Sequence, residues 1–263
     1  MQDGDLNKLP ILFNWPNFCF LEFTPYLEYM VRGKIKPEEF KEWNERMVMK
    51  YDPDAFHHHA NPFVRFTEKK RVNAIFKLMD VSQEDRVLEI GCGAGNILEK
   101  APPGKLFGVD ISLFILTKAK QKLNKKACLF LADAQTLPCK DQVFTRIICS
   151  EVLEHLLDPS AALNEAARIL GNQGVVIISV PNESMINRIK SILIRLGIFK
   201  WLFQRKGDYQ EMPERMEDEW HLQIFKLEEW LDLFEKLFRV ARMKKIPFSW
   251  LPLRYVVRLE KIE

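Results

Sequence analysis

The segment VLEIGCGAGN, residues 87–96, decides the fold. An apolar stretch suited to a buried strand runs directly into Gly91, Gly93 and Gly95, which alternate with Cys92 and Ala94. Glycine suits such a turn because a sharp change from strand to helix needs unusual backbone angles and because the backbone can then approach a ligand closely. The segment therefore predicts a strand, a glycine turn and a helix. A tight turn that binds nothing is the simpler alternative for the glycines alone.

Short apolar runs repeat this pattern along the chain. They are RVLEIG (86–91), LFGVD (106–110), ACLFLAD (127–133), FTRIICS (144–150) and GVVIISV (174–180). Nearly continuous apolar runs are typical of strands buried on both faces of a parallel sheet. Helical lengths lie between them, including 112–124 and 160–170, the second ending at Gly171. The alternation predicts an open, doubly wound α/β sheet.

The chain divides into an N-terminal extension with a lid segment, 1–66, and an α/β domain, 67–263. In the extension, Pro37 opens a predicted helix with Phe40, Trp43 and Met47 on one face. Thr67 is expected to cap a second helix. The domain carries an amphipathic insertion at about 184–222, followed by a helix at 227–237 and two closing strands near 239–246 and 254–260.

Composition excludes several classes of protein. The chain has 263 residues with a formal net charge of +3, which gives no basic footprint for nucleic acid. Its five cysteines form no CxxC pair, so a disulfide framework or cysteine zinc site is not expected. Prolines and polar residues interrupt the most apolar early stretch, and no membrane-spanning helix is expected. We expect a cytoplasmic protein.

Acidic residues follow three of the predicted strands. Asp110 and Asp133 end the second and third strands, and Ser150-Glu151 end the fourth. The carboxyl ends of parallel strands share one edge, where open α/β sheets bind ligands. Asp110 is placed to accept both hydroxyls of a ribose. Glu89 beside the glycine turn would repel a pyrophosphate and suits a ligand with an amino group, which argues against a dinucleotide.

Together, VLEIGCGAGN, GVDIS, LADAQTLPCKDQVFTRIICSEVLEHLLDP and GVVIISVPN resemble the class I S-adenosylmethionine-dependent methyltransferases. The likeness covers about residues 70–182 and is greatest to the small-molecule branch that includes the quinone-biosynthesis enzymes. It implies a Rossmann-like, seven-stranded sheet, mostly parallel with an antiparallel last strand and helices on both faces. The cofactor implied is S-adenosylmethionine.

The resemblance also implies a cofactor site, residue by residue. The residues that would surround the methionine part are Glu89, Gly91, Cys92, Gly93 and Gly95. Asp110 and Ile111 would hold the ribose and flank the adenine, and Asp133 and Ala134 would meet the adenine edge. Ser150 and Glu151 would line the floor near the sulfonium.

Candidates on the acceptor side are two histidines. Glu151, Glu154 and His155 would share one helical face, with His155 as a base; the alternative is that the acids stabilise a helix start and His155 only packs. His221 follows the insertion, where such enzymes often contact the acceptor. The spacing of the first three residues would permit a metal, but we assign no metal site from sequence. One residue of His57–His59, with Arg65, could close over the cofactor.

The stretch 184–207 carries six basic residues, no acidic residue and an apolar stripe. A basic amphipathic helix can rest on anionic lipid and admit a lipid-linked acceptor at the inner membrane surface. Alternatively, the stripe packs over the pocket as a lid, which is the interpretation that we favour. No nucleic-acid partner is expected, because Ser150-Glu151-Val152-Leu153 departs from the pattern of enzymes that methylate base amines.

The sequence thus predicts an enzyme that transfers a methyl group by direct displacement to a small or lipid-like acceptor, with an O-, C- or N-nucleophile. A different class stays open: a non-catalytic module that binds the cofactor and acts as a partner or regulatory protein.

Overall fold

The computed structural model describes residues 35–57, 61–199, 202 and 220–262. Several sequence predictions lie partly outside these residues: the N-terminal extension before residue 35, His58 and His59 of the proposed lid, and much of the amphipathic insertion at about 184–222. Among the described residues, no helix is both long and apolar enough to cross a membrane.

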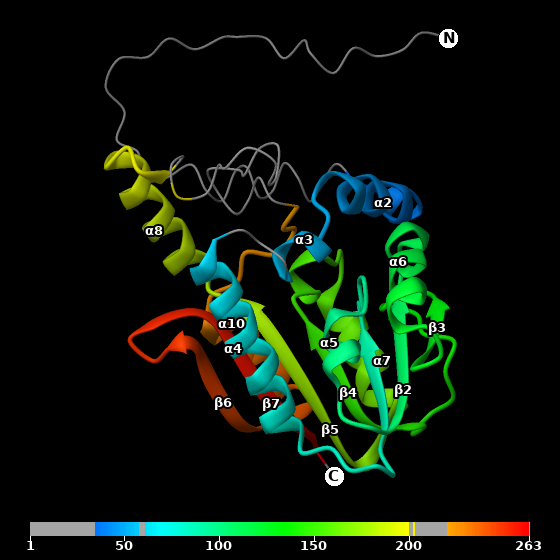
Figure 1. The fold of residues 1–263 in the computed structure, drawn as a ribbon. Helices are drawn as coiled ribbons and strands as arrows, with labels where there is room; N and C mark the ends of the chain where they lie inside the picture. The colour runs from blue at the N-terminus through cyan, green and yellow to red at the C-terminus, as the bar shows by residue number, and fades with distance from the viewer. Residues whose placement is uncertain (1–34, 58–60, 200–201, 203–219, 263) are drawn as a thin grey trace, which may run out of the picture.

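A seven-stranded sheet forms the centre of the domain, with strand order β3-β2-β1-β4-β5-β7-β6 (Figure 1). The strands are β1 (Arg86–Ile90), β2 (Lys105–Asp110), β3 (Ala127–Leu131), β4 (Phe144–Ser150), β5 (Leu170–Pro181), β6 (Phe238–Phe248) and β7 (Leu251–Lys261). The first five pair in parallel, and β7 is antiparallel to both β5 and β6. The predicted doubly wound sheet with an antiparallel last strand is confirmed.

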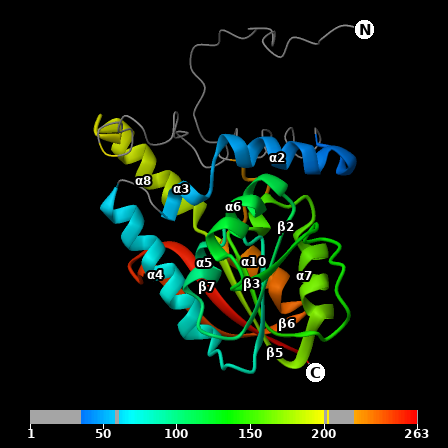
Figure 2. The ribbon, with the colours of Figure 1, turned by 45° about the vertical axis from the view of Figure 1, so that its right-hand side comes forward.

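Helices cover both faces of the sheet (Figure 2). The described helices of four residues or more are α2 (Phe40–Lys50), α3 (Asp54–His57), α4 (Pro62–Met79), α5 (Asn96–Lys100), α6 (Leu113–Leu123), α7 (Pro159–Ile169), α8 (Glu183–Arg195) and α10 (Leu227–Glu235). Successive residues of a strand point to opposite faces, so Val87 packs in the core under α4, α5 and α6, whereas Leu88 packs in the core under α7 and α10. This is why the central strands are apolar at nearly every position.

Two helix boundaries differ from the prediction. Thr67 does not cap α4; Asn61 does, because its Oδ1 accepts a hydrogen bond from the Phe63 N–H at 2.8 Å and Pro62 fits the first helical position. Thr67 lies inside the helix, where its hydroxyl donates to the Phe63 carbonyl oxygen at 2.9 Å. Nor does Gly171 end α7 as a cap, because the chain passes from Ile169 directly into β5.

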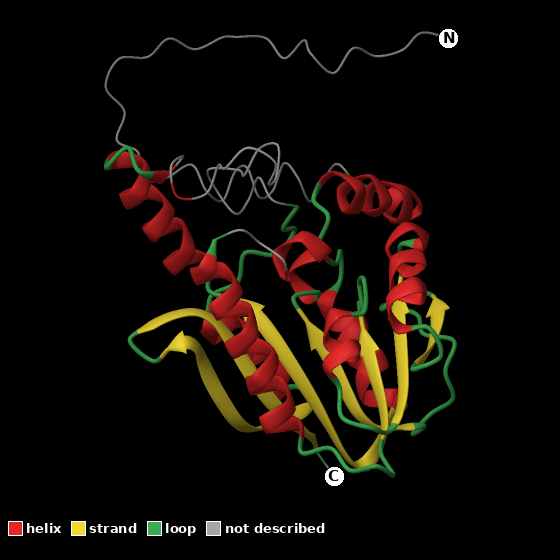
Figure 3. Cartoon of the chain, viewed as in Figure 1, coloured by secondary structure: helices red, strands yellow, loops and turns green. Residues whose placement is uncertain are grey.

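The carboxyl ends of the parallel strands meet at one edge, and α2 and α3 lie over that edge (Figure 3). Val48 of α2 packs against Ala94 and Ile115, which follow β1 and β2. Asp54 of α3 accepts hydrogen bonds from Asn96 and Lys122, both at 2.7 Å. The segment before α4 is therefore fixed above the part of the sheet where ligands bind in this class of fold.

Candidate functional site

A cavity of about 240 Å³ opens at this edge, between the strand ends and the segment that contains α2 and α3. All predicted site residues except Gly95 line it; these are Glu89, Gly91, Cys92, Gly93, Asp110, Ile111, Asp133, Ala134, Ser150, Glu151, His155 and His221. Gly95 caps α5 at φ +78°, and a Cβ there would lie 2.6 Å from the Leu123 side chain. Its role is therefore close packing of α5 against α6.

The glycine turn presents backbone to the cavity. Gly91 and Gly93 have φ angles of +66° and +51°, which residues with a Cβ rarely adopt. A Cβ on Gly91 would lie 2.3 Å from the Val152 side chain, whereas a Cβ on Gly93 would meet nothing within 4 Å. Cys92 contributes its backbone, because its sulfur packs next to Gly108 of β2. A ligand can therefore approach the turn most closely at Gly93.

Asp110, at the end of β2, fixes this turn. Its Oδ2 accepts from the Gly93 N–H at 2.9 Å, and its Oδ1 accepts from the Ser112 N–H at 3.0 Å. Burial raises the pKa of Asp110, against the lowering effect of these backbone donors. A carboxylate has about four acceptor positions, so two remain for ligand hydroxyls.

Glu89 is the second buried acid of the site, with 2% of its surface exposed. Its Oε2 has no hydrogen-bond partner among the described residues. Burial raises the pKa of Glu89 to about 8, even though the Arg71 guanidinium lowers it. A cationic group of a ligand beside Glu89 would stabilise the ionised form.

Beneath the cavity, six polar side chains form a closed ring that joins α4 to β4, β5 and β7. In bonding order they are Glu68, Arg71, Ser150, Ser179, Glu151 and Arg254. Sequence reasoning included two of the six, Ser150 and Glu151, among the site residues.

Arg71 begins the ring. It donates to Glu68 Oε2 through Nε and Nη2, at 3.1 and 2.5 Å, and to the Ser150 hydroxyl. Ser150 Oγ lies 2.8 Å from Ser179 Oγ, which donates to Glu151 Oε1 at 2.8 Å. The ring thus crosses from a helix to two neighbouring strands.

Arg254 of β7 closes the ring. Its Nε donates to Glu151 Oε2 at 2.7 Å, and its Nη2 lies 3.3 Å from Glu68 Oε1. Burial opposes ionisation of Glu68, but Arg71 and Arg254 outweigh it and hold the pKa of Glu68 at about 2. Arg71 and Arg254 therefore keep Glu68 ionised and compensate its charge.

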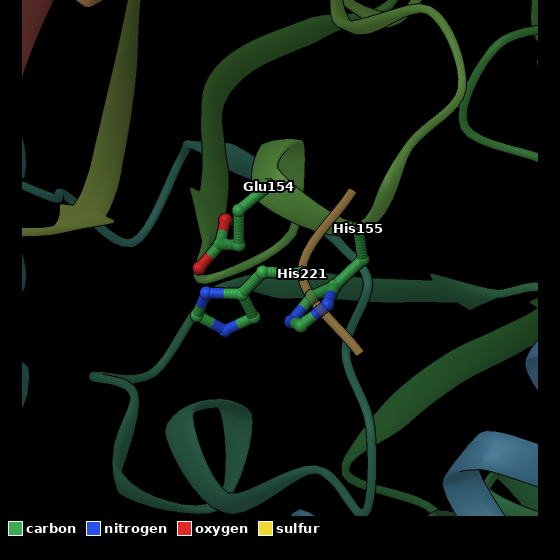
Figure 4. Close-up of side chains that lie close together, drawn as sticks. All are labelled: Glu154, His155 and His221. Atoms are coloured by element: carbon green, nitrogen blue, oxygen red, sulfur yellow. The ribbon is translucent and has the colours of Figure 1, made fainter. Parts of the chain in front are cut away.

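The segment after β4 differs from the prediction. Glu151, Glu154 and His155 do not share a helical face, because Glu151 has a φ of +56° and only a short 3₁₀ turn, η2 (Leu153–His155), follows. Glu151 consequently points into the polar ring. The structure instead brings Glu154 and His155 together with His221, from a segment far along the chain (Figure 4).

His155 is held in one orientation. Its Nδ1 lies 3.2 Å from the carbonyl oxygen of Trp220, and the His155 and Trp220 rings are in contact, tilted by 33° with their centroids 4.4 Å apart. Burial, with a further contribution from His221, lowers the pKa of His155 to about 3. The imidazole is therefore neutral at pH 7 and is a weak base.

The structure adds site residues that sequence reasoning missed. Arg71, Glu68 and Arg254 line the cavity, and His57, one of the three histidines proposed for a lid, lines it as well. Burial and the nearby Arg71 lower the pKa of His57 to about 4. Arg65 is exposed and is not part of the cavity wall. The signal in the sequence that could have indicated these residues is the charged pair Glu68 and Arg71, which lie one helical turn apart on the buried side of α4.

Comparison with known proteins identifies the domain. Residues 88–178 match the family model described as a methyltransferase domain. An uncharacterised protein of Methanocaldococcus jannaschii is 31% identical over 137 residues, which are 51% of this chain and 59% of that protein. The chain spans less than two thirds of the length of the first curated relatives that it matches.

Two further relatives cover more of the chain. A ubiquinone biosynthesis O-methyltransferase of Rhodopseudomonas palustris is 23% identical over 73% of this chain and 81% of its own length. The structure of the N-methyltransferase NodS of Bradyrhizobium japonicum, in complex with S-adenosylhomocysteine, superposes with a TM-score of 0.59 at 18% identity. The superposition covers 86% of this chain and the whole of the NodS chain. The fold predicted from sequence is confirmed, and the match to a methyltransferase domain lies within the predicted α/β domain.

We expect Arg254→Met to lower the free energy of unfolding by roughly 3–5 kcal/mol, because it leaves Glu151 and Glu68 with an uncompensated buried charge. Chemical denaturation measures the change. Arg239→Met is the matched control, since Arg239 pairs with Glu260 at the surface, and we expect a change below about 1 kcal/mol there. Equal losses in both variants would contradict a stabilising role for the ring.

The raised pKa of Glu89 makes stability depend on pH. In the unfolded chain this carboxyl has its ordinary pKa of 4.5, so between that value and about 8 the folded protein binds one more proton. Stability therefore falls as pH rises through this window, at up to about 1.4 kcal/mol per pH unit, and the fall ends above the folded pKa. Denaturation of the wild type and of Glu89→Gln across the window measures this, and the variant should lack this part of the slope. Parallel pH profiles of the wild type and Glu89→Gln would contradict the raised pKa of Glu89.

Proposed function

We propose, from the match of residues 88–178 to a methyltransferase domain, that the chain transfers a methyl group from S-adenosylmethionine to a small or lipid-like acceptor. The observation that carries this proposal is the single cavity wall that gathers the glycine turn, Glu89 and Asp110. Nothing in the described geometry favours the non-catalytic alternative.

In this proposal the cofactor lies along the strand ends. The ammonium group of its methionine part lies near Glu89 and the backbone of Gly91 and Gly93. Asp110 accepts from the ribose hydroxyls through its two remaining acceptor positions. The edge of the adenine meets Asp133 and Ala134, with Ile111 against its face; all three residues line the cavity.

The reaction needs alignment more than covalent catalysis. A lone pair of the acceptor forms a bond to the methyl carbon while the bond between carbon and sulfur breaks, and its electron pair stays on sulfur. The product is S-adenosylhomocysteine, and an acceptor that carries a proton on its nucleophilic atom gives that proton to a base or to water. Ser150 and Glu151, fixed in the polar ring, shape the floor near the sulfonium.

On the acceptor side, His155 and His221 lie at the same end of the cavity as Glu154. Because the pKa of His155 is about 3, this residue would not serve as a strong base and would instead orient the acceptor. The relative named for ubiquinone biosynthesis supports an aromatic or lipid-linked acceptor.

Isothermal titration with S-adenosylmethionine and S-adenosylhomocysteine tests the cofactor assignment. We expect micromolar binding of both, and at least tenfold weaker binding by Asp110→Ala, because two ribose contacts at about 1–1.5 kcal/mol each are lost. Gly93→Arg should abolish binding through steric block and backbone strain. Asp141→Ala, a change at an exposed acid far from the cavity wall, is the control. Failure of the wild type to bind either compound would overturn the proposed function.

If the acceptor is lipid-like, α8 would contact the membrane that contains it. The described part of the amphipathic stretch does not line the cavity, so the expected lid over the pocket is not seen in residues 183–199. Ile192 and Leu196 are instead 49% and 65% exposed, and Arg188 and Arg195 on the same helix are exposed as well. Exposed apolar side chains beside basic ones suit the surface of an anionic membrane.

Sedimentation with vesicles tests this membrane contact. The wild type should bind vesicles of phosphatidylcholine with phosphatidylglycerol more than pure phosphatidylcholine, because Arg188 and Arg195 attract anionic headgroups. The double variant Ile192→Asp and Leu196→Asp should lose binding, whereas Ser191→Asp, at an exposed polar position of α8, should lose much less. Equal sedimentation of all three proteins would exclude α8 as the contact.

A further inference from the structure

At the acceptor end of the cavity, Glu154, His155 and His221 converge (Figure 4). One potential ligand atom from each side chain lies within 4.8 Å of the other two. The backbone explains how residues so far apart in sequence meet: the N–H groups of Leu222 and Gln223 both donate to the Glu154 carbonyl oxygen, at 2.7 and 2.9 Å. The segment with His221 is thereby fixed against the η2 turn.

Glu154 is the residue that indicates a bound ligand. It is 1% exposed, and neither oxygen of its carboxyl group has a hydrogen-bond partner among the described residues. A buried carboxyl group without partners is costly, and such groups in native proteins usually mark a bound ion or water. A cation beside it would remove this penalty.

Both histidines are already oriented in the way that metal ligands are. His155 Nδ1 lies 3.2 Å from the Trp220 carbonyl oxygen, and His221 Nδ1 lies 2.7 Å from Glu183 Oε1. If each Nδ1 donates its proton there, each Nε2 keeps a lone pair. A metal-binding histidine typically donates its second N–H to a carbonyl or carboxylate group in this manner.

We propose that Glu154, His155 and His221 bind one divalent transition-metal cation, with Trp220 and Glu183 as outer hydrogen-bond partners. Two imidazoles and one carboxylate form a ligand set that zinc, cobalt and ferrous iron accept, whereas Mg²⁺ prefers oxygen ligands. Three protein ligands leave positions open on the cavity side. From sequence, the spacing of Glu151, Glu154 and His155 permits a metal, and no metal site is assigned from it; the fold replaces Glu151 by His221.

The metal site would add a catalytic group to the proposed methyl transfer, and its role in catalysis rests on that proposed function. An open position at the acceptor end of the cavity suits an acceptor oxygen, because a bound cation lowers the pKa of a hydroxyl group and stabilises the developing oxyanion. The acceptor class is then an alcohol or phenol. The acceptor proton leaves to water, and the oxygen keeps the electron pair that attacks the methyl carbon.

Binding of Co²⁺ and Zn²⁺ to the full chain tests the site without any methyl transfer. Equilibrium dialysis with elemental analysis should give one equivalent of either metal and little Mg²⁺, and Co²⁺ should give visible absorption bands. Glu154→Gln, His155→Ala and His221→Ala should each lose the stoichiometric binding. Glu183→Gln should weaken it by at least tenfold.

The run His57–His59 is the necessary control, because adjacent histidines can bind metal by themselves. A variant with all three changed to alanine should keep the one equivalent. Loss of metal in this variant, or unchanged binding in His221→Ala, would overturn the proposal. Titration of each protein with S-adenosylhomocysteine separates the two hypotheses: intact cofactor binding without metal binding rejects only the metal site, and absent cofactor binding rejects the proposed function.

Acetohydroxamate, a small oxygen donor, tests access from the cavity. Its addition to the Co²⁺ protein should shift the visible spectrum, because it would occupy the open positions. An unchanged spectrum would mean that the cation is closed off, and the role in binding the acceptor oxygen would be rejected.

Discussion

The polar ring beneath the cavity is the interaction on which the site depends. It connects α4, which precedes the sheet in the chain, with β7, which ends it, and it passes through the ends of β4 and β5. Arg71 and Arg254 compensate Glu68 and Glu151 in a buried place where an isolated charge would be costly. Removing one member therefore affects both stability and the position of Ser150 and Glu151 under the cavity.

The wall of the cavity contains carboxyl groups in three different states. Glu68 is ionised because two guanidinium groups surround it, Asp110 is fixed by backbone N–H donors, and Glu89 and Glu154 are buried without full compensation. Each of these two acids lies where the proposals place a positive charge: the ammonium group of the cofactor beside Glu89, and a metal cation beside Glu154. Local desolvation thus prepares two positions in one cavity for different cations.

The accuracy of the sequence predictions depended on how local each signal was. Strand positions were predicted well, because β-rich apolar runs are determined within a few residues, and the helix predicted at 112–124 corresponds to α6, Leu113–Leu123. The prediction that Thr67 caps α4 was wrong, because Asn61-Pro62 is a stronger start signal for this helix. The common helical face of Glu151, Glu154 and His155 was wrong because Glu151 adopts a positive φ, which spacing cannot reveal.

The sequence by itself determined the order of strands and helices, the glycine turn, and the acids that end the strands, because each is a property of a short contiguous segment. Only the tertiary structure decided which distant residues share a buried volume. Arg71 meets Ser150, Arg254 meets Glu151, and His221 meets Glu154, through contacts between elements that sequence separates by tens of residues. Burial then determines the charge states of these groups, and no local pattern specifies how much water surrounds a side chain.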